Sequence, residues 1–163
     1  MKKLITCLIL ILMVSSIFAE VMPDFKLPDA AGKNVALQEL LGKGPVIIDF
    51  WADYCKPCKD AMPQLNNLAE KYDSLTVVMI SIDAPKNLPK AKNYLKSKNY
   101  KFITLFDSEK TLAKKIGATN PPHTFILNKQ GEIVYSHIGY EPGVENEYEM
   151  HIRNLLGHKT EAE

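Results

Sequence analysis

The chain has 163 residues, of which 46% are hydrophobic, so it can form one compact core but is short for two domains. Its 20 basic and 19 acidic residues nearly balance, which argues against a nucleic acid as partner. One domain is therefore expected over residues 20–163.

Residues 1–19 have the form of an export signal. Two lysines at positions 2 and 3 precede an apolar run from Leu4 to Phe18 that ends at Ala19. Cleavage after Ala19 is the favoured prediction. An uncleaved membrane anchor is the alternative, because Ile17 is larger than the residue preferred at that place before a cut. Cleavage would remove Cys7, and the exported domain would keep only Cys55 and Cys58.

The first half of this domain predicts a hairpin, a buried strand and a long helix. Residues 24–44 have the pattern of a hairpin followed by a helical turn. Residues 45–52 form a continuous β-prone run, typical of a strand buried on both faces, and Asp49 is an anomaly within it. Apolar residues then recur at helical spacing over 56–72, and Pro63 is expected to bend that helix.

The second half continues the alternation of strands and helices. Ser108 is expected to cap one short helix, which Gly117 ends. Alternating elements that end in a hairpin predict an α/β fold, in which helices flank a mixed central sheet. The other expected elements are a buried strand at 74–83, a lysine-rich surface helix at 86–99, a short strand at 102–106, two strands within 121–139 and a helix at 144–156.

Cys55 and Cys58 lie where the strand at 45–52 gives way to a helix. A helix N-terminus offers unpaired amide donors and partial positive charge, both of which favour a thiolate. Cys55 is therefore the expected attacking thiol, aided by the charge of Lys56, and Cys58 is the expected resolving thiol. A purely structural disulfide is the alternative, although so short a loop gains little entropy. A zinc site is disfavoured because it needs more than one such pair.

Two further features point to the same chemistry. A carboxyl buried at Asp49 would have a raised pKa and would suit a general base and acid for Cys58. The alternative is a structural aspartate, hydrogen-bonded to main chain or water. A cis bond in the pair Pro121 and Pro122 would leave main-chain groups free to bind an extended peptide, and the alternative is an ordinary surface loop.

These stretches together resemble the thioredoxin superfamily. FWADYCKPCKDAMP is similar to its active-site segment, and PPHTFILNKQGEIV to the cis-proline strand and hairpin of the exported TlpA/ResA-like branch. DFKLPDAAGKNVALQELLGKGPVIIDFWA is similar to the AhpC/TSA-redoxin-like N-terminal extension of that branch. The resemblance covers about residues 24–156. It implies a thioredoxin-like fold with an N-terminal β-hairpin and a central insertion at about residues 86–106.

The resemblance also implies the roles of individual residues. Cys55 and Cys58 match the redox-active disulfide of the family, as attacking and resolving thiol. Asp49 matches the buried aspartate of thioredoxins, and Pro122 the cis-proline that faces the cysteines. Trp51 matches the aromatic residue packed beneath the site. The expected substrate-binding residues are Trp51, Tyr54, Pro121 and Pro122.

The implied function is that of a thiol-disulfide oxidoreductase in the periplasm or another extracytoplasmic space. It would reduce disulfides in exported proteins and draw electrons from a membrane donor of the thiol-disulfide relay type. Apocytochromes c are one candidate substrate class, although residues 84–86 replace a glutamate that some ResA-like members have there. A monomer without cofactor or resident metal is expected.

Two other functions compete with this one. A copper-binding or copper-delivery module would use Cys55, Cys58 and His123 as soft and borderline ligands. A thiol peroxidase is disfavoured because Ala52, and not a threonine, lies three residues before Cys55.

Overall fold

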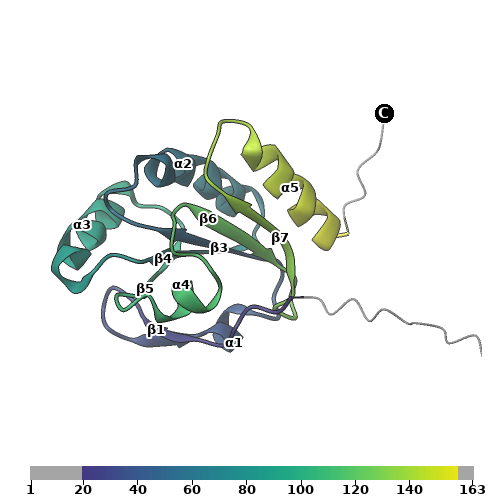
Figure 1. The fold of residues 1–163 in the computed structure, drawn as a ribbon. Helices are drawn as coiled ribbons and strands as arrows, with labels where there is room; N and C mark the ends of the chain where they lie inside the picture. Colours follow the sequence, from purple (N-terminus) through teal and green to yellow (C-terminus); the bar gives the residue numbers. More distant parts are fainter. Residues whose placement is uncertain (1–19, 158–163) are drawn as a thin grey trace, which may run out of the picture.

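The computed structural model describes residues 20–157, so the export signal expected at 1–19 lies outside the described residues. Within this range no helix has the length and apolar character needed to cross a bilayer. The elements shown in Figure 1 are β1 Lys26–Pro28, β2 Asn34–Ala36, α1 Leu37–Leu40, β3 Val46–Trp51, α2 Lys56–Lys71, β4 Thr76–Ser81, the 3-10 helix η1 Pro85–Asn87, α3 Leu88–Lys98, β5 Ile103–Phe106, α4 Thr111–Lys115, β6 His123–Leu127, β7 Ile133–Ile138 and α5 Val144–Leu155.

A mixed five-stranded sheet in the order β5-β4-β3-β6-β7 forms the centre of the molecule. The central strand β3 pairs in parallel with β4 and antiparallel with β6, and all six of its residues are buried. Helices α2, α3 and α5 lie on one side of the sheet, and α4, α1 and the β1-β2 pair lie on the other (Figure 1). The predicted α/β architecture is confirmed.

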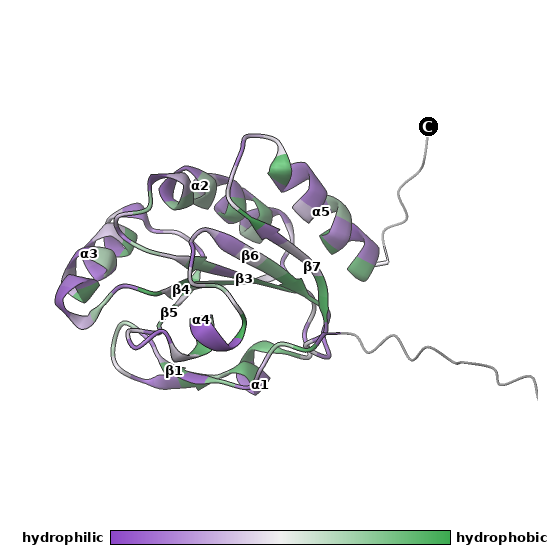
Figure 2. Ribbon diagram, viewed as in Figure 1, coloured by the Kyte–Doolittle hydropathy of each residue, from purple (hydrophilic) through white to green (hydrophobic). Residues whose placement is uncertain are grey.

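Hydropathy follows this layering. Figure 2 shows hydrophobic residues concentrated on the central strands, whereas the outer surfaces of the helices are largely hydrophilic. Burial of apolar area is the main favourable term in folding, and β3 contributes to it on both faces. Asp49 is the one charged residue within β3, and it is only 1% exposed.

The N-terminal hairpin and the insertion also fold as expected. Strands β1 and β2 pair antiparallel, with Lys26 opposite Ala36. The Asp29 carboxylate accepts hydrogen bonds from the N–H groups of Ala31 and Lys33 within the turn, each at 2.9 Å. Residues 86–106 supply most of η1, helix α3 and strand β5, and β5 extends the sheet by pairing in parallel with β4.

The chain ahead of β1 adds a short contact to the edge of the sheet. The Glu20 carbonyl accepts a hydrogen bond from the N–H of Ile133 at 2.7 Å, and the Met22 N–H donates to the Gly131 carbonyl at 3.0 Å. Met22 is 2% exposed and belongs to the hydrophobic core. The described chain is therefore anchored to the start of β7 from its first residues.

The expected cap of the helix after β5 is wrong. Helix α4 begins at Thr111, and the carboxylate of Asp107, not the hydroxyl of Ser108, binds its free amides. Asp107 accepts from the N–H groups of Thr111 and Ala113, each at 2.8 Å. Lys110 adopts a left-handed conformation (φ 56°), and this extra turn places the aspartate, one residue earlier than Ser108, under the helix end.

Candidate active site

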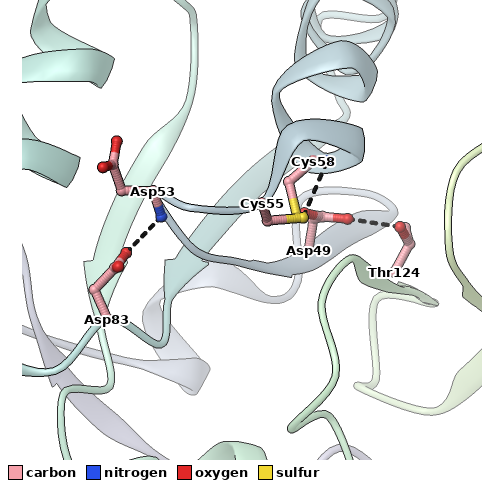
Figure 3. Close-up of a disulfide and its surroundings, with 6 residues drawn as sticks. All are labelled: Asp49, Asp53, Cys55, Cys58, Asp83 and Thr124. Atoms are coloured by element: carbon pink, nitrogen blue, oxygen red, sulfur yellow. Dashed lines mark hydrogen bonds between the residues drawn. A yellow bond between two sulfur atoms is a disulfide. The ribbon is translucent and has the colours of Figure 1, made fainter.

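Cys55 and Cys58 form a disulfide at the first turn of α2 (Figure 3), with an S–S distance of 2.05 Å. Cys55 is the N-cap residue of the helix, and its Sγ accepts a hydrogen bond from the Cys58 N–H at 3.2 Å. A sulfur in this position faces the amide donors of the helix N-terminus, which stabilise a thiolate after reduction. Cys55 is 6% exposed and Cys58 is completely buried, so an incoming disulfide would reach Cys55 more easily.

Lys56, expected to add positive charge beside Cys55, is paired with an acidic side chain. Its ammonium pairs with Asp60 one turn further along α2, and 83% of its side chain is exposed. The Asp60 carboxylate offsets that positive charge. The helix N-terminus adds its own partial positive charge at Cys55.

Asp49 lies within β3, the strand that leads into the cysteine turn (Figure 3). The hydroxyl of Thr124, opposite it on β6, donates a hydrogen bond of 2.7 Å to Asp49 Oδ2. Asp49 Oδ1 has no hydrogen-bond partner among residues 20–157. Burial raises the pKa of Asp49 to about 7, and the hydrogen bond from Thr124 opposes that rise. A carboxyl with this pKa can both accept and return a proton near neutral pH.

Asp83 is a second buried carboxyl at the site, and the sequence interpretation overlooked it. It follows β4 directly and is 1% exposed. Asp83 Oδ2 accepts a hydrogen bond of 2.9 Å from the Asp53 N–H (Figure 3) and another of 2.9 Å from the Ser81 hydroxyl. Asp53 belongs to the turn between β3 and Cys55, so Asp83 holds that turn. The sequence signal that could have identified Asp83 is its position, as an aspartate at the end of a predicted buried strand.

The peptide bond between Pro121 and Pro122 is cis, in agreement with the sequence prediction. The main chain there is less free than expected, because the Pro122 carbonyl accepts a hydrogen bond from the Gly139 N–H at 2.8 Å. Neither proline has an N–H to donate. Within residues 20–157, the Pro121 carbonyl accepts no such main-chain hydrogen bond.

The two expected aromatic contacts differ in exposure. Tyr54 is 67% exposed beside Cys55. Trp51 is fully buried, and its ring lies 6.0 Å from that of Tyr94 on α3. Trp51 therefore packs beneath the site and does not reach a substrate directly.

His123, the third ligand of the copper alternative, follows the cis-proline and is 7% exposed. Its ring stacks on Phe125 at a centroid distance of 4.2 Å, and burial lowers its pKa. Residues 20–157 contain no group of three or more potential ligands close enough to hold a metal ion. The copper alternative gains no support from this arrangement.

The sheet order, the cis-proline and the disulfide at the start of α2 together define a thioredoxin-like protein. The sequence profile of the AhpC/TSA family matches residues 18–136, and the chain belongs to this family.

Individual relatives agree with this placement. Over 112 residues the chain is 34% identical to the thiol-disulfide oxidoreductase ResA of Bacillus thuringiensis, a match that covers 69% of this chain and 64% of the relative's length. A crystal structure from Chlorobium tepidum, provisionally named thiol:disulfide interchange protein DsbE, is similar with a TM-score of 0.78 and 29% identity. That match covers 85% of this chain and 97% of the other. The exposed lipoprotein thioredoxin Etrx1 of Streptococcus pneumoniae has a TM-score of 0.68 and 25% identity, over 82% of this chain and 100% of its own.

Proposed function

We propose that this protein is a thiol-disulfide oxidoreductase that reduces disulfides in exported proteins. The observation that carries the proposal is the Cys55–Cys58 disulfide, with Cys55 at the N-cap of α2 and Cys58 buried behind it. The name of the ResA relative, thiol-disulfide oxidoreductase, supports the same chemistry. Such a couple transfers electrons without a bound cofactor.

The reaction begins from the reduced protein. The Cys55 thiolate attacks one sulfur of the substrate disulfide, forms a mixed disulfide and releases the first substrate sulfur as a thiolate. Cys58 then gives its proton to the Asp49 carboxylate and attacks Cys55 Sγ. The second substrate sulfur leaves and takes up a proton, and the protein retains the Cys55–Cys58 disulfide. Two electrons have passed to the substrate, and a membrane donor of the thiol-disulfide relay type restores the dithiol.

Trapping of the mixed disulfide tests the attacking role of Cys55 and the resolving role of Cys58. We expect Cys58→Ser to attack a substrate disulfide and stop as a stable adduct through Cys55, because no second thiol can release the substrate. Cys55→Ser should form far less adduct, because Cys58 is buried. Mass spectrometry of the trapped complexes identifies the sulfur involved. Equal yields of adduct from the two variants would contradict the roles given to the thiols.

We further propose that the protein acts outside the cytoplasmic membrane, as a monomer. The basic and apolar pattern of residues 1–19 supports export, as does the similarity to the exposed lipoprotein thioredoxin of Streptococcus pneumoniae. Residues 1–20 fused to a reporter should carry it across the cytoplasmic membrane, whereas the same fusion with Leu8 and Leu10 changed to Asp should not. A reporter that stays in the cytoplasm in both cases would refute export. Exported proteins with disulfides, apocytochromes c among them, are the substrates to test.

A further inference from the structure

A row of side chains crosses the sheet at Asp49. Strand pairing sets Asp49 beside Met79 of β4 and Thr124 of β6, and sets Thr124 beside His137 of β7. Residues paired across neighbouring strands point to the same face of a sheet. Tyr148 reaches this row from α5, which places the row on the face that α2 and α5 cover (Figure 1).

Two hydroxyl groups in this row form a chain that ends on the carboxyl. The Thr124 hydroxyl donates to Asp49 Oδ2 at 2.7 Å, and the Tyr148 hydroxyl lies 3.3 Å from Thr124 Oγ1. A threonine hydroxyl has one hydrogen, which is already directed at Asp49. Tyr148 must therefore donate to Thr124, and both hydrogens point toward the carboxylate. Thr124 and Tyr148 are each 2% exposed, so water does not compete for these bonds.

We propose that Thr124 and Tyr148 are positioning residues for Asp49, and that their donor chain holds Oδ2, favours the ionised carboxylate and leaves Oδ1 to exchange a proton with Cys58. The inference rests on the proposed role of Asp49 in resolving the mixed disulfide. Hydrogen bonds to a charged acceptor stabilise the charged form, and in a dry interior such a chain is stronger than its bonds would be in water. Without the chain, burial alone would keep Asp49 protonated at neutral pH.

Other titratable groups face the same region, and the test must separate them from Asp49. Cys58 approaches from α2, and it does not titrate while the disulfide is intact. From β7 come His137, whose Nε2 lies 3.8 Å from Glu141, and Tyr135, whose hydroxyl donates to Glu147. The neighbour on β4, Met79, has no charge.

The carbon-13 carboxyl shift of Asp49, followed against pH in the purified oxidised protein, reports its ionisation alone. We expect Thr124→Val, which keeps the shape and loses the donor, to raise the midpoint by about one to two pH units. Tyr148→Phe should raise it by less. Thr124→Ser, which keeps the hydroxyl, should restore the wild-type midpoint, and Thr76→Val at the start of β4 serves as the matched control. An unchanged or lowered midpoint in folded Thr124→Val and Tyr148→Phe would overturn the inference.

A rate measurement completes the test. The pH profile for resolution of the mixed disulfide should move upward with the Asp49 midpoint in both variants. A shifted midpoint with an unmoved rate profile would also overturn the inference, because the chain would then not act on proton exchange with Cys58. Trapping of an adduct by Cys58→Ser depends neither on the Asp49 midpoint nor on the rate profile. A failure of the oxidoreductase proposal would therefore appear in the trapping experiment alone.

Discussion

Asp83 is the residue that fixes the turn in front of the cysteines. Its Oδ2 accepts from the Asp53 main-chain N–H and from the Ser81 hydroxyl, and the residue is 1% exposed. Tyr54, the exposed aromatic residue beside Cys55, directly follows Asp53 in the chain. The hydrogen bond to Asp53 therefore fixes the main chain immediately before Tyr54. A side chain that holds a backbone group in this way is a positioning residue rather than a catalytic one.

Removal of this carboxylate should loosen the turn. We expect Asp83→Ala to lower the free energy of unfolding by about 1 to 3 kcal/mol, because the buried Ser81 hydroxyl and the partly buried Asp53 N–H lose their acceptor. The Asp53 amide should also exchange with solvent faster, since its hydrogen bond is gone. Denaturant unfolding and amide hydrogen exchange measure the two effects, with Asp73→Ala at an exposed position as the control. Unchanged protection of the Asp53 amide would show that Asp83 does not hold the turn.

The site residues that belong to short sequence motifs could be predicted. The positions of Cys55, Cys58 and the cis bond at Pro122 follow from motifs of a few letters. Thr124 and Tyr148 were not predicted, because Thr124 lies 75 residues from Asp49 and meets it only through the pairing of β3 with β6. A lone sequence does not specify that register.

Among the elements, those with a distinct apolar pattern were predicted best. The continuous apolar runs at 45–52 and 74–83 located β3 and β4 closely, and the helical spacing of apolar residues over 56–72 located α2. The start of α4 was misplaced, because Asp107 and Ser108 are both good capping residues. The choice between them depends on the left-handed turn at Lys110 and on the hydrogen bond from the Asp107 N–H to the Ser81 carbonyl at 2.8 Å. That contact comes from tertiary packing and leaves no local pattern in the sequence.

For the molecule as a whole, the candidate site lowers folding stability mainly through one residue of the central strand β3. Val46–Trp51 is buried along its full length, and most of its residues stabilise the fold through the hydrophobic effect. Asp49 does the opposite when it ionises, because a buried carboxylate loses hydration that one hydrogen bond from Thr124 only partly replaces. The group proposed to move protons is therefore also one that weakens the fold as the pH rises.

Because ionisation of Asp49 destabilises the folded state, the stability of the protein should depend on pH. The pKa of Asp49 is raised from 3.8 to about 7 in the folded state, so between these values the folded protein binds a proton that the unfolded chain has lost. The free energy of unfolding should therefore fall as the pH rises from about 4 to about 7, and the Asp49 contribution amounts to about 4 kcal/mol at 1.36 kcal/mol per unit. Above the folded pKa, both states are ionised and the loss levels off.

Comparison with Asp49→Asn isolates this contribution. The variant cannot ionise at position 49, whereas His123 and the other titrating groups are common to both proteins and cancel in the difference. We expect the variant to gain stability relative to wild type as the pH rises from about 4 to about 7, with a constant difference above about pH 8. Urea unfolding of the oxidised proteins across this range measures that difference. A difference that stays constant from about pH 4 upward would mean that Asp49 keeps an ordinary pKa in the folded protein.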